Sequence, residues 1–445
     1  MHTRHVADIS CEITQNTTIR RKSTVKTDTI LAGIAITLLL LTLSLPAVAS
    51  DYTLNIFGNA NEDDTINMQD VTYTELIILE YRDKTDLADG KHDGKINMQD
   101  VTQIELVILG KEKEITIMDS ADRTVTVRKP VERIVVLTYP DAEAIKIVKA
   151  EERVVGVSSD IKARGTFFPG LCKLPSTGVT SSPDLERILE LQPDIIFTGK
   201  LRSMGTSLEA KLPDTIAVTC WDMGRLEVMT QNIRMLGYIL GNTEDAQEFC
   251  TFYQEYLDET IWDRVSEIPD GDRERVYIEY SEDYRAFATG SSGHEICVAA
   301  GGVNIAADLP RFSEKPIVEV DCEWLIEENP DVIVKAVRCK TGLCGYGEDD
   351  PAAMGLERER IMSRPGWEGM TAVAENRTYL IDMDLVGSTA NFIGATYMAK
   401  WLYPKVFDDL DPEAFHQEYL TRFQRLDYDL DEHGVFVCPS APEVV

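Results

Sequence analysis

Apolar and polar positions divide the chain into a short internal repeat and two longer regions on either side of one helix. Between residues 243 and 268 apolar side chains recur every three or four positions, the spacing of an amphipathic helix. The segments DLERILELQPDIIF (184–197) and DCEWLIEENPDVIV (321–334) flank it and share Asp, Glu, an apolar pair, Glu and Pro-Asp at equal offsets. The pattern predicts two similar lobes joined by a single long helix. An ordinary core helix is the alternative that periodicity alone leaves open.

Both longer regions alternate apolar strands with helical stretches, which predicts parallel sheets with helical crossovers. The clearest strands are expected at 134–137 before the long helix and at 275–280 after it. The fold class is therefore α/β, with two Rossmann-like lobes. We expect an N-terminal lobe at 111–242, a linking helix at 243–268, a C-terminal lobe at 269–430 and an extended arm at 431–445.

The repeat lies ahead of the lobes, where INMQDVTYTELIIL (66–79) and INMQDVTQIELVIL (96–109) agree at eleven of fourteen positions. Oxygen-bearing side chains precede each copy at alternating positions of a short loop, the spacing with which proteins bind Ca²⁺. The candidate calcium ligands are Asn59, Asn61, Asp63, the carbonyl of Thr65, Asn67 and Asp70 in the first loop, and Asp89, Asp93, the carbonyl of Lys95, Asn97 and Asp100 in the second. Polar turns without a metal are the alternative.

This repeat resembles the dockerin module, a pair of loop–helix units that end in Asp where an EF-hand loop has Glu. The resemblance covers residues 50–110 and implies a small all-α, EF-hand-like module, Ca²⁺ as cofactor and a cohesin-like domain as a candidate partner. Two positions depart from the pattern. Lys91 replaces a ligand of the second loop, whose occupancy therefore stays open, and Asp64 replaces the glycine that the second loop keeps as Gly94. Aspartate tolerates the left-handed conformation of such a glycine better than most residues.

Composition and the N-terminal segment indicate compartment and partners. The 76 acidic and 44 basic residues give a net charge of −32, which argues against nucleic acid as a partner. An uncharged apolar run at 30–45 follows several basic residues and precedes Ala47-Val48-Ala49, the order found in export signals. We expect residues 1–49 to be a signal peptide or a signal anchor, and the protein to be exported to the cell surface or beyond.

The cysteines give a weaker indication. Eight of the nine follow the expected signal, mostly in apolar contexts typical of buried thiols. Cys339 and Cys344 form the one close pair, and a disulfide between them stays open.

Four segments of the lobes, PVERIVVL (130–137), LERILELQPDIIF (185–197), AAGGVNIA (299–306) and RPGWEGMTAVAENRTYLID (364–382), carry a second resemblance. In this order they resemble the ABC-importer substrate-binding proteins for ferric siderophores, cobalamin and haem. The resemblance covers about residues 115–429. It implies no enzyme, but capture of an iron chelate (siderophore or haem) or a corrinoid between the lobes and delivery to ABC permease subunits in the membrane.

The same resemblance implies that one acidic residue on each lobe docks on the permease. By position these are Glu186 and Glu323, each in the first turn of a short helix that Asp184 or Asp321 can cap. The apolar pairs of these helices, Ile188 with Leu189 and Leu325 with Ile326, are expected to face the core. Ordinary first-turn acids are the alternative.

Ligand-binding residues are expected in loops at the carboxyl ends of strands, where open α/β sheets bind ligands. The candidates for the cleft are Tyr139, Phe167, Lys200, Arg202, Trp221, Tyr280, Tyr284, His294 and Arg338. Aromatic rings would cover the flat face of a corrin, porphyrin or catechol, and Arg202 or Arg338 would meet negative charge. His294 is also a candidate metal ligand, although a loop histidine is more often simply hydrogen-bonded.

Two other classes of function compete with transport. A secreted hydrolase is disfavoured because the chain contains no HExxH, P-loop or GxSxG motif. A dockerin-bearing scaffold or adhesion protein, whose lobes no longer bind a ligand, stays open.

Overall fold

A computed structural model of the chain describes residues 52–199, 202–310, 316–338 and 342–439. The expected export segment, Lys200, Cys339 and the last residues of the expected arm lie outside these ranges. Within them, every helix is too short or too polar to cross a lipid bilayer.

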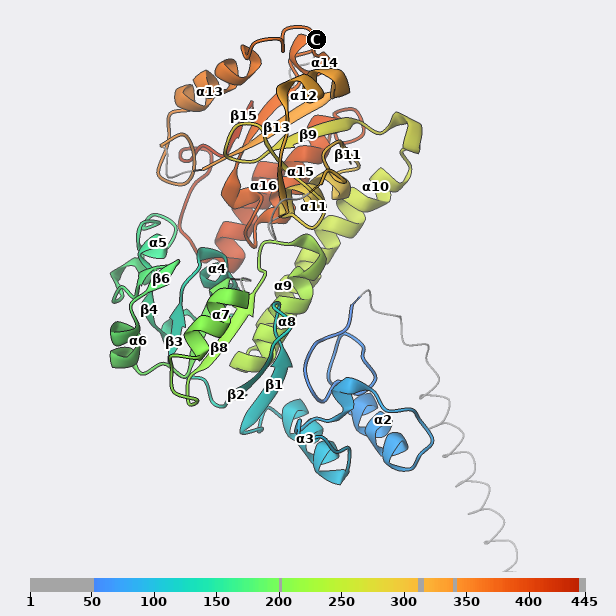
Figure 1. The fold of residues 1–445 in the computed structure, drawn as a ribbon, viewed down its shortest axis with the longest axis vertical. Helices are drawn as coiled ribbons and strands as arrows, with labels where there is room; N and C mark the ends of the chain where they lie inside the picture. Colours follow the sequence, from blue (N-terminus) through green and yellow to red (C-terminus); the bar gives the residue numbers. More distant parts are fainter. Residues whose placement is uncertain (1–51, 200–201, 311–315, 339–341, 440–445) are drawn as a thin grey trace, which may run out of the picture. The chain divides into compact units, whose positions relative to one another are not determined.

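The N-terminal lobe is built on a four-stranded parallel sheet in the order β4-β3-β7-β8 (Figure 1). Its strands are almost continuously apolar and buried, as expected for a parallel sheet covered on both faces. The strands are β3 (Ile134–Val136), β4 (Val154–Val157), β7 (Ile195–Gly199) and β8 (Ala217–Trp221). The helices of this lobe include α4 (Tyr139–Ile147), α5 (Ser159–Lys162), α6 (Leu185–Leu191), α7 (Arg202–Glu209) and α8 (Met229–Leu240).

The C-terminal lobe has a seven-stranded sheet in the order β12-β10-β9-β13-β14-β15, with β11 beside β9. Its centre is parallel, whereas β10, β12 and β15 pair antiparallel with their neighbours, so this sheet is mixed. The strands are β9 (Arg275–Glu279), β10 (Arg285–Phe287), β11 (Val303–Asn304), β12 (Ile317–Glu319), β13 (Val332–Val337), β14 (Thr378–Asp382) and β15 (Val437–Cys438). The predicted α/β architecture with two parallel-sheet lobes is confirmed, and the expected arm contributes β15 at one edge of the sheet.

The segment between the lobes is helical from Thr243 to Ser266. It comprises α9 (Thr243–Leu257), a π-helical stretch (Asp258–Trp262) and α10 (Asp263–Ser266). Phe252 of α9 packs edge-on against Phe392 of α15 (Asn391–Leu402), and Tyr256 packs against Phe415 of α16 (Pro412–Glu418). The helix is therefore fixed to the C-terminal lobe along its aromatic face.

The repeat folds into two helices, α2 (Met68–Ile78) and α3 (Met98–Ile108). Asn67 and Asn97 cap them, and Asp70 and Asp100 complete the two capping boxes. These helices precede a hairpin of β1 (Glu114–Met118) and β2 (Thr124–Arg128).

The repeat is attached directly to the N-terminal lobe. Ile56 forms a β-bridge with Ile117 of β1, Asp64 forms an ion pair with Arg234 of α8, and the Ile66 N–H donates to the Tyr238 hydroxyl at 3.0 Å. Asp64 has no positive φ, whereas the equivalent Gly94 has a φ of +84°. The sequence departure at Asp64 therefore serves a contact with the lobe and not a left-handed turn.

Candidate functional site

A cavity of about 440 Å³ lies between the two lobes. Its wall includes Thr138 after β3, Gly199 at the end of β7, Trp221 at the end of β8 and Arg338 after β13. These are the carboxyl ends of parallel strands, where crossover loops leave backbone and side-chain groups open to a ligand.

Three of the predicted cleft residues, Tyr139, Trp221 and Arg338, line this cavity. The Arg164 guanidinium carbon lies 3.9 Å from the centroid of the Tyr139 ring, and burial raises the pKa of the Tyr139 hydroxyl well above its usual value. The buried Trp221 donates its indole N–H to the Thr219 hydroxyl at 2.8 Å. The cavity thus has two fixed aromatic side chains in its wall.

Two predicted cleft residues lie elsewhere. Phe167 is buried against Phe168 and Tyr346, each ring centroid 4.7 Å away, and is absent from the cavity wall. Tyr284, at the turn between β9 and β10, packs against Trp367 and lies 4.8 Å from the Arg364 guanidinium. Neither residue lines this cavity, because each ring packs against other side chains of the protein.

The remaining predicted cleft residues lie next to residues of the cavity wall, begin a helix, or fall outside the residues that the structure describes. The Tyr280 ring lies 5.2 Å from the Arg338 guanidinium, and the His294 Nδ1 lies 3.2 Å from the amide nitrogen of Asn304. His294 is thus a hydrogen-bonded residue of α11 (Ser292–Ala299), whose first residue, Ser292, lines the cavity. Arg202 is the first residue of α7, and Lys200 is outside the described ranges.

Two arginines of the cavity, Arg164 and Arg225, were not predicted. Arg164 pairs with Asp384 of the C-terminal lobe, and the Nε of Arg225 donates to Glu295 at 2.5 Å. With Arg338 they place three guanidinium groups around the cavity. Arg225 follows β8 as Arg338 follows β13, so the rule that selected Arg338 would also have found Arg225, whereas Arg164 follows the short helix α5 and the rule does not reach it.

Carboxyl and hydroxyl groups line the cavity between the arginines. Asp141 accepts a hydrogen bond from the Thr138 hydroxyl at 2.5 Å, while its other oxygen is buried without a partner. Burial raises the pKa of Asp141 to about 7, so this carboxyl is partly protonated near neutral pH. Asp160 accepts from the Thr180 hydroxyl at 2.8 Å. The cavity can therefore offer donors to an anion and acceptors to hydroxyl groups.

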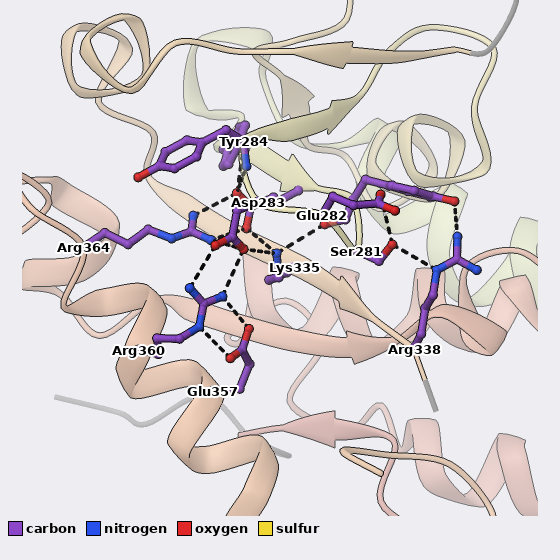
Figure 2. A network of polar contacts seen from close by, with 12 residues as sticks. Ser281, Glu282, Asp283, Tyr284, Lys335, Arg338, Glu357, Arg360 and Arg364 are labelled. Carbon is purple, nitrogen blue, oxygen red and sulfur yellow. Dashed lines mark hydrogen bonds and ion pairs between the residues drawn. The ribbon is translucent and has the colours of Figure 1, made fainter. Parts of the chain in front are cut away.

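Arg338 is held by a polar network that extends into the C-terminal lobe (Figure 2). Its Nε donates to the Ser281 hydroxyl at 3.0 Å, and it also contacts the Tyr280 hydroxyl. Two residues after Ser281, Asp283 forms ion pairs with Lys335, Arg360 and Arg364. Hydrogen bonds from Arg360 in particular hold the pKa of Asp283 well below its usual value.

The buried carboxylate of Glu279 anchors the same network. It accepts from Lys335 at 2.8 Å, from Arg364 at 2.8 and 3.0 Å, and from the backbone N–H of Tyr284 at 2.7 Å. Each buried charge of this network, on Glu279, Lys335 and Arg364, therefore has an opposite partner, as a low-dielectric interior requires. The network fixes the turn that orients Arg338.

The two candidate docking residues occupy equivalent short helices. Glu186 lies exposed in the first turn of α6, and Glu323 lies exposed in the first turn of α12 (Cys322–Glu328). The Asp184 side chain accepts from the Arg187 N–H at 3.1 Å, and Asp321 accepts from the Glu323 N–H at 2.7 Å.

The expected burial of the apolar pairs on these helices is correct only in part. Ile188 and Leu325 are fully buried, whereas Leu189 is 42% exposed and Ile326 is half-buried. A seven-residue helix packed on one side buries a single narrow stripe, and the next residue lies about 100° away from it.

The first candidate calcium loop contains a buried oxygen without a hydrogen-bond partner. Asn59 is fully buried and donates to the carbonyls of Leu54 and Asp63, which leaves its Oδ1 unpaired. Asp70 accepts the N–H groups of Asn61 and Asn67 at 3.2 and 2.8 Å, and burial raises the pKa of Asp70 to about 7. A cation beside these oxygens would compensate both features.

In the second loop backbone N–H groups satisfy the carboxylates. Asp89 accepts from Asp93 and Gly94, the Asp93 side chain accepts from Lys95, and Asp100 accepts from the N–H of Lys91. The Asn67 and Asn97 side chains cap their helices by accepting from Gln69 and Gln99. Among the described residues no group of three or more acidic, His or Cys side chains is arranged to hold a metal ion, so any cation here depends on amide and carbonyl oxygens as well.

Comparisons with known proteins agree with this architecture. A family model described as periplasmic binding protein matches residues 134–385. An ABC transporter substrate-binding lipoprotein of Bacillus subtilis, YvrC, is 24% identical over 303 residues, which cover 66% of this chain and 87% of that protein. The molybdate-binding protein MolA of Haemophilus influenzae is 24% identical over 348 residues, 71% of this chain and 92% of that one.

The match to a third relative is shorter, and a solved structure shares the fold. The cobalamin-binding protein of Halobacterium salinarum is 26% identical over 231 residues, 50% of this chain and 58% of that protein. The crystal structure of the TroA-like protein FepB from Veillonella parvula covers 72% of this chain and 98% of its own, with 25% identity and a TM-score of 0.60. The family match spans more than half of the sequence. The chain therefore belongs to the periplasmic binding protein family, as the substrate-binding protein of an ABC transporter.

Proposed function

We propose that this protein captures an iron chelate (a ferric siderophore or haem) or a corrinoid in the cleft and delivers it to an ABC permease. The observation that carries the proposal is the meeting of three arginines with Tyr139 and Trp221 around one cavity between the lobes. Guanidinium groups bind the carboxylate, catecholate or phosphate groups of such ligands, and aromatic side chains contact a flat ring system. The relative from Halobacterium salinarum, named a cobalamin-binding protein, supports a corrinoid.

Titration of the purified chain with haemin, cyanocobalamin, ferric citrate, a ferric catecholate and molybdate tests the proposal. Because Trp221 is part of the wall, a bound chromophore or metal should change its fluorescence. A Trp221→Phe variant should still bind the ligand in calorimetry, but most of the fluorescence change should be lost. Binding of molybdate alone would replace the chelate by a small oxyanion, and binding of none would favour a scaffold or adhesion protein.

For docking on the permease we propose Glu186 and Glu323. Both are exposed on equivalent helices, one on each lobe, as a surface that contacts two permease subunits requires. Glu186→Lys and Glu323→Lys should abolish uptake in cells while ligand affinity stays unchanged. The matched controls, Glu190→Lys and Glu327→Lys, reverse exposed charges elsewhere on the same two helices. Uptake at the wild-type level in the first pair would show that the docking residues lie elsewhere.

For residues 52–110 we propose a dockerin-like module that binds Ca²⁺ in its first loop. The support is the unpaired buried Oδ1 of Asn59 together with the buried carboxylate of Asp70, which accepts the backbone N–H groups of Asn61 and Asn67 in the same loop. If Ca²⁺ binds only the folded loop, a concentration of about 100 times Kd adds about 2.7 kcal/mol to the unfolding free energy of the module. Asn59→Ala should remove this gain and Asp93→Ala in the second loop should not. Equal stability with Ca²⁺ and with a chelator would exclude the site.

The outer face of the module supports a cohesin-like domain as its partner and, with the expected export signal, a location on the cell surface. Met68 and Met98, at equivalent positions of the repeat, are 58% and 55% exposed, and Leu79 and Leu109 are 61% and 64% exposed. Two equivalent pairs of exposed apolar side chains form a repeated surface of the kind that partners bind. Met68→Glu combined with Met98→Glu should abolish co-precipitation with such a partner, with the single variants as controls.

A further inference from the structure

Two ion pairs join the lobes at the cavity, and in both the arginine comes from the N-terminal lobe. Arg164 contacts Asp384 through two nitrogens, one at 3.0 Å, and Arg225 contacts Glu295 at 2.5 Å. The arginine side chains keep 18% and 23% of their surface exposed and line the cavity. Each guanidinium thus faces both the ligand space and a carboxylate of the opposite lobe.

The carboxylates are the fixed partners. Asp384 is 6% exposed, and its backbone N–H donates to Asp382 at 3.1 Å in the turn after β14. Glu295 is 5% exposed in the first turn of α11, and its Oε2 is buried without a hydrogen-bond partner. Arg225 also contacts the exposed Glu227. When a partner changes, the long and partly exposed arginine side chains are therefore the groups that can move.

We propose that Asp384 and Glu295 compete with the ligand for Arg164 and Arg225, so that the cleft selects ligands with separate negative groups. This inference rests on the proposed function. In the ligand-free protein the two pairs hold the lobes together; an anionic ligand replaces each protein carboxylate by one of its own groups. A neutral ligand offers no such replacement, so breaking the pairs would take an ion-pair partner away from two buried carboxylates.

Removal of the competing carboxylates tests the proposal, because the direction of the change in affinity decides between competition and simple positioning. Asp384→Asn and Glu295→Gln should each bind ferric citrate or a ferric catecholate, as anionic probes with separate negative groups, about tenfold more tightly, because one charge-assisted hydrogen bond no longer opposes binding. Affinity for cyanocobalamin, which has no net charge, should change less than about twofold. Weaker binding of the anionic probes would show that the carboxylates only position the arginines, and would overturn the proposal.

The matched control is Glu151→Gln. Glu151 pairs with Arg425 at 2.6 Å and also joins the two lobes, but neither residue lines the cavity. This variant loosens the contact between the lobes without releasing a cavity arginine, so affinity for the anionic probes should stay at the wild-type level. A gain in Glu151→Gln equal to that in Asp384→Asn would assign the effect to general loosening, and the competition would be excluded.

Hydrogen exchange of the ligand-free protein separates this inference from the proposed function. If the wild-type chain binds none of the probes, the proposed function fails. The ion pairs can still be tested through peptides that contain residues 222–226 and 385–388. High salt should increase their exchange in the wild type, because screening weakens the pairs, and the double variant should exchange fast at any salt concentration. Equal exchange in both proteins at low salt would show that the pairs do not hold the lobes.

Discussion

The lobes meet at two glycines, and an alanine at one of them should change both stability and binding. Gly224 follows β8, Gly387 follows β14, and both line the cavity. A Cβ added to Gly224 would lie 2.7 Å from the Gly387 carbonyl oxygen and 2.9 Å from its carbonyl carbon. Both contacting atoms are backbone atoms of the other lobe, so no side-chain rotation can relieve the overlap.

The size of the effect of Gly224→Ala follows from that distance. Ordinary van der Waals contacts begin at 3.4 Å, so the two loops must separate by about 0.7 Å. Overpacking of this kind costs about 1–3 kcal/mol, while loss of chain entropy in the unfolded state returns about 0.4–1 kcal/mol, since φ at Gly224 lies outside the left-handed region. The difference is a net loss of about 0–2.6 kcal/mol, so we expect a loss of about 1 kcal/mol of unfolding free energy, together with faster ligand release from a cleft held partly open.

Urea denaturation and the fluorescence titration measure the two effects of Gly224→Ala. Gly170→Ala is the matched control, because it lies in the same lobe, has no positive φ and would place its Cβ more than 4 Å from any neighbour. The control should match or slightly exceed wild-type stability. Wild-type stability and wild-type affinity in Gly224→Ala would refute the close contact of the lobes at this point.

Three further changes test other parts of the molecule. Burial raises the pKa of Glu143 to about 7, so the folded state binds this proton more tightly than the unfolded state and stability falls as pH rises from 4.5 toward 7. Glu143→Gln should remove up to about 3 kcal/mol of that fall in denaturation curves, and Glu152→Gln, an exposed control, should not. Tyr256→Pro in α9 should lower the unfolding free energy by about 3 kcal/mol or more, whereas Tyr256→Phe should keep the helix and lose only the hydrogen bond to Glu418. Equal stability of the two variants in urea denaturation would contradict a continuous helix. Arg234→Met should lower the unfolding temperature of the repeat module in calorimetry, because it removes the ion pair to Asp64 that helps to hold the module on α8; an unchanged transition would show that this ion pair does not stabilise the attachment.

The sequence predicts the architecture better than it predicts the site. Apolar spacing and the paired Pro-Asp segments are local patterns, so they place the lobes, the linking helix and the exposed Glu186 and Glu323. The cavity depends on contacts between distant residues. Arg164 is 220 positions from Asp384, and no local pattern shows that they meet. Phe167 is aromatic like Tyr139 and also lies beyond the carboxyl end of a strand, yet it packs inside the lobe, because its position depends on neighbours such as Tyr346.

The attachment of the repeat module has a consequence for how the receptor is presented. A module on a flexible linker would let the cleft sample all directions relative to whatever holds the module. Here Ile56 pairs with β1, and Asp64 and Ile66 contact α8, so the rotational freedom of a linker is absent. A partner that bound α2 and α3 would therefore also fix the orientation of the cleft relative to itself, because the module and the N-terminal lobe cannot rotate independently.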